Sequence, residues 1–304
     1  MTIAPSLAVV IATSDRYAVL EDTLRDLLVQ SEPADEILVV DATPAADHAI
    51  PAWVDAPTHA RVRYLRSEGI GANRARNVGL RDVRADYVLL LDDDMRLPTD
   101  CLARVRAAHR EGWEAVHGQL TENGRSLVPM TPSDRPLWDV VRHRHGDLRC
   151  HTIAVSSGFT SIRTARLRAL GWLDEDYVYL FDDLDLGLGL WRAGCITLHD
   201  PRVTATHLRA PAGGGRHPQP AALMARNKYA DKYRFLAKWF SARALRVELM
   251  VDVAIVLRAH IGRPVALVRE LKEIADAWRA HARVPWPSVG RPRSSALHTA
   301  QRPA

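Results

Sequence analysis

The stretch Tyr87-Val88-Leu89-Leu90-Leu91-Asp92-Asp93-Asp94 places three adjacent carboxylates directly after an apolar run. A continuous run of Val and Leu is typical of a strand buried on both faces of a parallel sheet. Three neighbouring carboxylates repel one another unless a cation or an arginine neutralises them. Mg²⁺ and Mn²⁺ prefer oxygen ligands and often share them with phosphates. The stretch therefore indicates a divalent metal site that handles a nucleoside diphosphate, although Asp-rich turns also cap helices.

The first 120 residues alternate short apolar strands with helical patterns. This alternation predicts an α/β fold, with a Rossmann-like, mostly parallel sheet flanked by helices. Ligands bind such sheets beyond the carboxyl ends of the strands, where Thr13, Asp41 and the Asp triplet fall. The predicted strands are Leu7–Ala12, Glu36–Asp41, Val62–Leu65 and the apolar run before Asp92, and one predicted helix carries Leu20, Leu24, Leu27 and Leu28 on a single stripe.

Five ordered segments between Leu7 and His207 resemble the inverting glycosyltransferases of family 2, whose catalytic domain has the GT-A fold. The order and spacing of the five segments are more specific than any one of them. The segments are Val10 to Arg16, Ile37 to Asp41, the Gly-x-x-x-Ala-Arg-Asn-x-Gly run from Gly71 to Gly79, the Asp triplet, and the pair Gly171 to Glu175 and Asp182 to Leu186.

The resemblance implies transfer of a sugar from a nucleotide donor with the help of Mn²⁺ or Mg²⁺. Cleavage of the sugar–phosphate bond develops negative charge on the diphosphate, which a metal stabilises. We expect Asp94 to contact the metal and Asp92 to lie near the metal or the ribose. Asp93 points the opposite way in an extended segment, so its role in the nucleotide site is more structural. The other expected nucleotide-sugar-binding residues are Thr13, Asp41 and Arg76.

Two further carboxylates, Asp182 and Asp183, follow a second apolar segment and precede a helical pattern. By resemblance Asp183 is the general base that deprotonates the acceptor hydroxyl. Asp182 stands where the family usually has Glu, which leaves its catalytic role less defined. The pair also suits a helix N-terminus, where it would favour the helix dipole. His207 is a candidate third metal ligand with His217 as its competitor, although a single histidine after a strand is often an ordinary packed residue.

The donor is not fixed by the sequence. Ser14 stands where the family commonly has a Tyr that stacks on the base, and Ala42-Thr43-Pro44 replaces its Asp-Gly-Ser. The absence of an aromatic platform weakens any specific expectation of uracil. UDP, dTDP and GDP sugars therefore remain open as donors, and the acceptor is a hydroxyl of a cell-surface glycan, a glycolipid or a secondary metabolite, with a lipid-linked glycan as one candidate.

The C-terminal part differs from the rest in charge. Residues 221–304 contain 16 Lys and Arg against 6 Asp and Glu, whereas residues 1–220 contain 25 against 30. We expect a catalytic domain over residues 1–220, a basic helical region over 221–283 and a disordered tail over 284–304. The stripe Leu267, Leu271, Ile274 and Trp278 predicts an amphipathic helix that packs on the catalytic domain, on another subunit or on an anionic membrane.

The cysteines and the overall charge bear on location and partners. Cys101, Cys150 and Cys195 are odd in number and lack metal-type spacing, and we find no leader before Leu7. These features predict a cytoplasmic location, with peripheral contact to the membrane left open. The sequence pI of about 9.3 raises a nucleic-acid-binding alternative, but the basic residues lack interleaved aromatics, so no nucleic acid is expected. A non-catalytic nucleotide-binding or scaffolding module of the same fold is a further alternative. A sugar-phosphate nucleotidyltransferase would carry a Gly-rich, basic phosphate loop after its first strand, which Thr13-Ser14-Asp15-Arg16 matches poorly.

Overall fold

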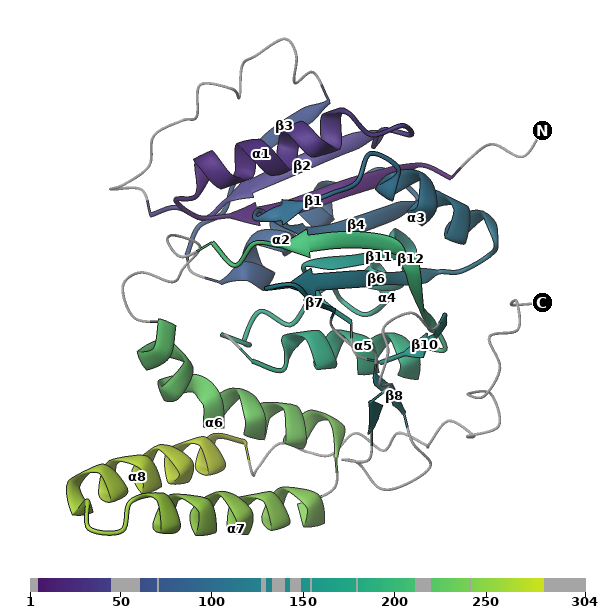
Figure 1. Ribbon diagram of the computed structural model, residues 1–304. Helices are drawn as coiled ribbons and strands as arrows, with labels where there is room; N and C mark the ends of the chain where they lie inside the picture. Colours follow the sequence, from purple (N-terminus) through teal and green to yellow (C-terminus); the bar gives the residue numbers. More distant parts are fainter. Residues whose placement is uncertain are drawn as a thin grey trace.

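The computed structural model describes residues 5–44, 61–69, 71–126, 130–132, 140–142, 149–153, 155–178, 180–210, 220–240 and 242–281. They form a ten-stranded sheet, a small two-stranded sheet and flanking helices (Figure 1). The strands are β1 (Leu7–Thr13), β2 (Glu36–Asp41), β3 (Val62–Arg66), β4 (Tyr87–Asp92), β5 (Met95–Arg96), β6 (Ala115–Glu122), β7 (Arg125–Ser126), β8 (Met130–Pro132), β9 (Val140–Arg142), β10 (Cys150–Thr152), β11 (Phe159–Arg163) and β12 (Thr197–His207). The helices are α1 (Tyr17–Leu28), α2 (Ala72–Asp82), α3 (Cys101–Arg110), α4 (Thr164–Ala169), α5 (Asp182–Arg192), α6 (Pro220–Trp239), α7 (Ala242–Ala259) and α8 (Pro264–His281).

The large sheet has the strand order β10-β12-β6-β11-β4-β1-β2-β3. Its β4-β1-β2-β3 part is parallel throughout, as the apolar strands separated by single helices predict. β11 lies between β4 and β6 and runs antiparallel to both, whereas β12 pairs in parallel with β6. The predicted α/β class is confirmed, and the antiparallel β11 interrupts the parallel arrangement.

The register of the parallel strands brings the polar strand ends together. Thr13 of β1 is paired with Asp41 of β2, and Ala12 is paired with Asp92 of β4. On the other side, the last residue of β12, His207, is paired with Met95 of β5, which follows the Asp triplet. The carboxyl ends of β1, β2, β4 and β12 therefore meet at one edge of the sheet, where ligands bind in this architecture.

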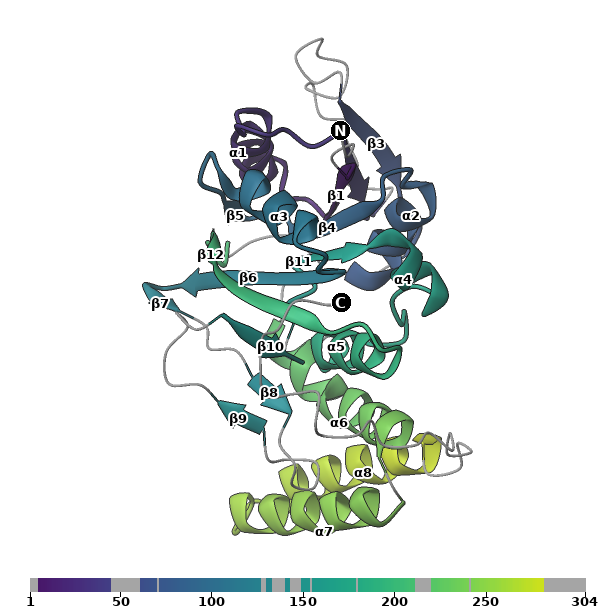
Figure 2. The ribbon, with the colours of Figure 1, turned by 90° about the vertical axis from the view of Figure 1, so that its right-hand side faces the viewer.

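Alternate residues of the central strands pack into two separate cores. The α1 and α3 helices cover one face, and α2, α4 and α5 cover the other (Figure 2). Of the predicted α1 stripe, Leu20, Leu24 and Leu27 are fully buried and Leu28 is partly buried against the first core. Burial on both faces explains why these strands read as continuous apolar runs and not as alternating ones.

The helices α6, α7 and α8 form a third core of their own. They make the layer farthest from β1 to β3 in both views (Figures 1 and 2). The predicted stripe on α8 is confirmed, because Ile274 is buried in this core and Leu267, Leu271 and Trp278 pack against it. His217 and the tail over 284–304 lie outside the described residues, and the division into a catalytic domain, a helical region and a tail stays a prediction.

None of the helices in the described part of the chain combines the length and the apolar composition that a membrane crossing requires.

Two buried histidines make the stability of the fold depend on pH. His109 lies between the Trp113 carbonyl, 2.7 Å from its Nδ1, and the Ser161 hydroxyl, 2.8 Å from its Nε2. Burial lowers the pKa of His109 from 6.5 to about 4 and that of His117 to about 3. Between these values and 6.5 the unfolded chain takes up protons that the folded chain does not, so acidification favours unfolding.

We therefore expect each of these histidines to contribute a fall of roughly 1.4 kcal/mol per pH unit to the free energy of unfolding as the pH drops from about 6.5 towards 4. The raised carboxyl pKa values of Asp93 and Asp182 contribute with the opposite sign, so the histidine share is read from the difference between variant and wild type. Urea unfolding at several pH values measures this slope. In a His109→Gln variant, the slope of the free energy of unfolding against pH should lose the contribution of one histidine, roughly 1.4 kcal/mol per pH unit. An unchanged slope in the variant would contradict the assignment.

Candidate active site

The Asp triplet forms the tight turn between β4 and β5. Asp92 is the last residue of β4 and is partly exposed, whereas Asp93 and Asp94 are buried. Asp93 points towards β1, where its carboxylate accepts a hydrogen bond of 2.7 Å from the Thr13 hydroxyl. Asp94 points towards β12, whose following backbone amide at Ala210 donates to it at 2.9 Å. The triplet thus divides into two carboxylates near β12 and one that is directed into the fold.

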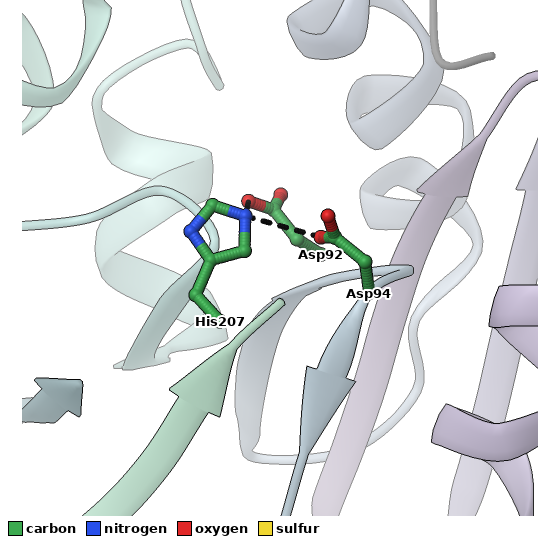
Figure 3. A group of neighbouring side chains, drawn as sticks. All are labelled: Asp92, Asp94 and His207. Atoms are coloured by element: carbon green, nitrogen blue, oxygen red, sulfur yellow. Dashed lines mark ion pairs between the residues drawn. The ribbon is translucent and has the colours of Figure 1, made fainter. Parts of the chain in front are cut away.

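Three side chains of this edge converge as metal ligands would. One possible ligand atom from each of Asp92, Asp94 and His207 lies within 4.8 Å of the others (Figure 3). The His207 Nε2 atom is 3.1 Å from Asp94 Oδ1 and 3.9 Å from Asp92 Oδ2. The predicted third ligand therefore lies beside the two predicted Asp ligands.

The surroundings of His207 suit a metal ligand. Its Nδ1 lies 2.7 Å from Glu122 Oε1, which orients the ring and directs Nε2 towards the two aspartates. Burial opposes protonation, but the carboxylates of Asp94, Asp92 and Glu122 raise the pKa of His207. Two carboxylates and an imidazole with an oriented second nitrogen form a donor set that fits Mn²⁺ or Mg²⁺. A bound cation would take the place of the proton on Nε2.

Arg16 supplies part of the positive charge that the Asp triplet requires. Its guanidinium is buried, lies 3.3 Å from Asp93 Oδ1 and forms an ion pair with Asp94 Oδ2. Burial opposes ionisation of Asp94, but His207 and Arg16 lower its pKa below the ordinary value. Burial raises the pKa of Asp93 to about 7, and Arg16 and Thr13 only partly offset this effect. Asp94 is therefore the permanently charged member of the buried pair.

Asp41 is the centre of a buried polar cluster at the end of β2. Its carboxylate accepts hydrogen bonds from Tyr17 at 2.7 Å, from Tyr64 and from the Thr43 hydroxyl at 2.5 Å, and it pairs with Arg66 at 3.0 Å. Burial opposes its charge, but these partners lower the pKa of Asp41. Asp41 itself is fully buried, whereas the two tyrosines around it are partly exposed. Sequence reasoning missed both tyrosines, because neither stands at position 14, where the family commonly has its Tyr and this chain has Ser14.

Arg76 connects the metal ligands to the second acid pair. It lies on α2, which approaches the sheet closely because Gly79 has no side chain. A Cβ atom at this position would come within 2.9 Å of Val10 and Val40. The buried guanidinium of Arg76 contacts Asp92 Oδ1 at 2.6 Å and the Ser157 hydroxyl at 3.0 Å. Arg76 was expected among the nucleotide-sugar-binding residues, which stays a prediction, and in the structure its guanidinium contacts protein groups.

The acid pair lies in the first turn of α5. Phe181, directly before it, adopts a left-handed conformation with φ of 68°, which turns the chain into the helix. The Ser157 amide donates a hydrogen bond of 2.6 Å to Asp183 Oδ1, and the Ser157 hydroxyl lies 3.5 Å from Asp182 Oδ2. Burial and the neighbouring charge of Asp183 raise the pKa of Asp182 to about 7, and burial also raises the pKa of Asp183. Elevated carboxyl pKa values in a cleft are typical of groups that accept protons.

The loop that leads to the acid pair is held by α6. Asp231 accepts hydrogen bonds from the backbone amides of Val178 at 3.2 Å and Leu180 at 2.9 Å. Lys238 of the same helix pairs with Asp174 at 3.0 Å and with Asp185 at 2.8 Å. These partners are more than 50 residues apart in sequence, so sequence reasoning did not find them. The C-terminal helices therefore help to position the acid pair.

Gly158 is required by the position of Asp92. A Cβ atom at residue 158 would overlap the Asp92 carboxylate, which Arg76 holds from the other side. We expect Gly158→Ala to displace Asp92 and to weaken Mn²⁺ binding by about tenfold or more, the usual cost of disturbing a ligand's surroundings. Isothermal titration with Mn²⁺ measures the effect. The control is Gly189→Ala, because a Cβ atom at residue 189 would make only ordinary van der Waals contacts. This variant should bind Mn²⁺ like the wild type.

The comparisons with known proteins agree with this arrangement. The sequence model of the family "Glycosyl transferase family 2" matches residues 8–164, more than half of the chain. No curated protein sequence matches the chain significantly. Among solved structures, GalNAc-T7 with UDP, GalNAc and Mn²⁺ is 14% identical, with a TM-score of 0.57 over 78% of this chain, and the chain spans only 51% of that protein.

Two further solved structures cover most of the chain. TarS of S. aureus, residues 1–349 with UDP-GlcNAc, is 13% identical with a TM-score of 0.58, covering 90% of this chain and 73% of the other. The mannosyltransferase PcManGT of Pyrobaculum calidifontis, with GDP-Man and Mn²⁺, is 19% identical with a TM-score of 0.54, covering 92% and 76%. At these identities the structures show the shared fold, and the family match is independent of them. The chain therefore belongs to glycosyl transferase family 2.

Proposed function

We propose that the protein is a metal-dependent, inverting glycosyltransferase that transfers a hexose-type sugar from a nucleoside diphosphate donor to an acceptor hydroxyl. The observation that carries this proposal is the convergence of Asp92, Asp94 and His207 within 4.8 Å. Arg76 links this group to the acid pair that begins α5. The complexes of GalNAc-T7 with UDP and Mn²⁺ and of PcManGT with GDP-Man and Mn²⁺ support a similar donor and cation here.

Each part of the site has a separate task in this reaction. The cation held by Asp92, Asp94 and His207 would neutralise the charge that develops on the leaving diphosphate. Asp183 accepts the proton of the acceptor hydroxyl while the acceptor oxygen bonds to the anomeric carbon. The bond from that carbon to the diphosphate oxygen breaks with its electron pair, on the opposite side of the sugar. Asp182 lies beside this base, and its pKa of about 7, raised by burial and by the charge of Asp183, lets it share the acidic proton of the pair.

The donor nucleotide is tested by melting the purified protein with UDP, dTDP or GDP, each with and without Mn²⁺. A ligand that binds only the folded protein raises the melting temperature by mass action. We expect one nucleotide to raise it only in the presence of Mn²⁺, and we expect Asp94→Asn to remove that shift. A shift that is independent of Mn²⁺, or no shift with any of the three nucleotides, would overturn the metal-dependent mechanism.

A further inference from the structure

The outer surface of α7 and α8 carries a row of exposed apolar side chains. Residues spaced three and four apart on α7 share one helix face, and further exposed apolar residues follow in sequence in the turn and at the start of α8. Their exposed fractions range from 42% for Val251 to 84% for Val265. We call this row the outer ridge, and its members are Val247, Met250, Val251, Ile255, Ile261, Val265 and Val268.

The side chains of the outer ridge do not belong to the hydrophobic core that α6, α7 and α8 share. The opposite faces of the same helices are already packed, with Leu245, Val256 and Ile274 buried against α6 and one another. The three helices form the layer farthest from β1 to β3 in both views (Figures 1 and 2). Contiguous exposed apolar groups of this kind mark a surface that contacts another partner.

Exposed basic side chains outnumber exposed acidic ones along the outer ridge, and the acidic Glu273 and Asp276 lie further along α8, where Asp276 pairs with Arg279 at 3.1 Å. Within residues 242–272, all of which the structure describes, every acidic side chain pairs with a lysine of α6: Glu248 and Asp252 with Lys232 at 2.7 and 2.8 Å, and Glu270 with Lys228 at 2.5 Å. The basic side chains of the same stretch point outwards and are exposed. They are Arg243, Arg246, Arg258, Arg263, Arg269 and Lys272.

The charge decides between the possible partners of this surface. A second copy of the chain, placed symmetrically, would bring the same basic side chains against one another, which is unfavourable. An anionic lipid surface offers acyl chains to the apolar groups and negative headgroups to the arginines. We propose that the outer ridge docks the protein on the surface of an anionic membrane, without any segment crossing the bilayer.

The consequence concerns the acceptor. Because α6 contacts both the α7 and α8 layer and the loop before Asp182, docking would hold the active site at a fixed distance from the lipid surface. An acceptor hydroxyl carried on a lipid would then be presented at the membrane. This consequence rests on the proposed function, whereas the docking itself does not.

Vesicle flotation of the full chain tests the docking. We expect binding to vesicles of phosphatidylcholine with about 30% phosphatidylglycerol, no binding to phosphatidylcholine alone, and release at about 0.5 M NaCl. Replacing both Ile261 and Val265 by Asp should weaken binding more than about tenfold. Replacing both Arg263 and Arg269 by Gln should weaken it about 30-fold.

The control is Val29→Asp at the end of α1, where the native side chain is 59% exposed but lies outside the ridge. It should bind vesicles like the wild type, and all variants should keep the wild-type melting temperature and nucleotide shift. Equal binding by the Ile261 and Val265 variant, or no binding by the wild type, would overturn the proposal. Sedimentation of the wild type as a dimer that the same variant dissociates would also overturn it, in favour of a second copy.

Discussion

Asp183→Asn is expected to abolish sugar transfer while leaving the protein folded and able to bind its donor. The Asn side chain retains an oxygen that accepts the hydrogen bond of 2.6 Å from the Ser157 amide, so the start of α5 should keep its conformation. What it lacks is a carboxylate to receive the acceptor proton. Loss of a general base lowers kcat by about 10² to 10⁴. The equal loss in kcat and kcat/KM would identify an interaction made in the transition state.

The measurement is the rate of donor turnover with an acceptor, together with the melting shift caused by nucleotide and Mn²⁺. The matched control is Asp176→Asn in the loop before α5, whose carboxylate is 72% exposed and pairs with Arg234. That variant should keep nearly wild-type kcat. If Asp183→Asn transferred sugar at the normal rate, Asp183 would not be the base, and Asp182 would be the next residue to replace.

The central fold and the main carboxylates of the site were predictable because their signals are local. A parallel strand buried on both faces is a continuous apolar run, and the residues after it must lie at the carboxyl edge of the sheet. His207 was proposed from the family resemblance, whereas the Asp triplet and the acid pair follow recognisable apolar segments. Their mutual repulsion also predicted a counter-charge, which the structure supplies as Arg16, Arg76 and His207.

The partners of these residues were not predictable, because each contact joins segments far apart in sequence. Glu122 of β6 reaches His207 of β12 only because those two strands are paired. Asp231 of α6 accepts a hydrogen bond from the loop before the acid pair, 51 residues earlier in the sequence, and no periodicity in the sequence indicates this contact. The sequence pattern marked Asp41 and Arg76 as ligand-binding positions, but their burial among protein partners depends on packing that only the folded chain defines.

Arg76→Met is expected to cause a large loss of stability. The guanidinium is buried, with only 6% of its side chain exposed, and it lies 2.6 Å from the Asp92 carboxylate. Burial opposes its charge, but Asp92, Asp182 and Asp183 together raise the pKa of Arg76. A methionine fills similar space without charge and leaves these carboxylates uncompensated. Removing one partner from a buried ion pair costs about 3 to 5 kcal/mol.

Urea unfolding with EDTA or with Mn²⁺ measures this loss. The control is Arg74→Met on the same helix, whose side chain is 48% exposed and pairs with Glu175 at 3.4 Å. An exposed pair of this kind contributes less than about 1 kcal/mol. Mn²⁺ should stabilise the Arg76 variant more than the wild type, because the cation then supplies the positive charge that Asp92 has lost. Equal stability of the two variants would mean that Arg76 does not balance the acidic cluster, and that Arg16 and His207 alone keep the carboxylates together.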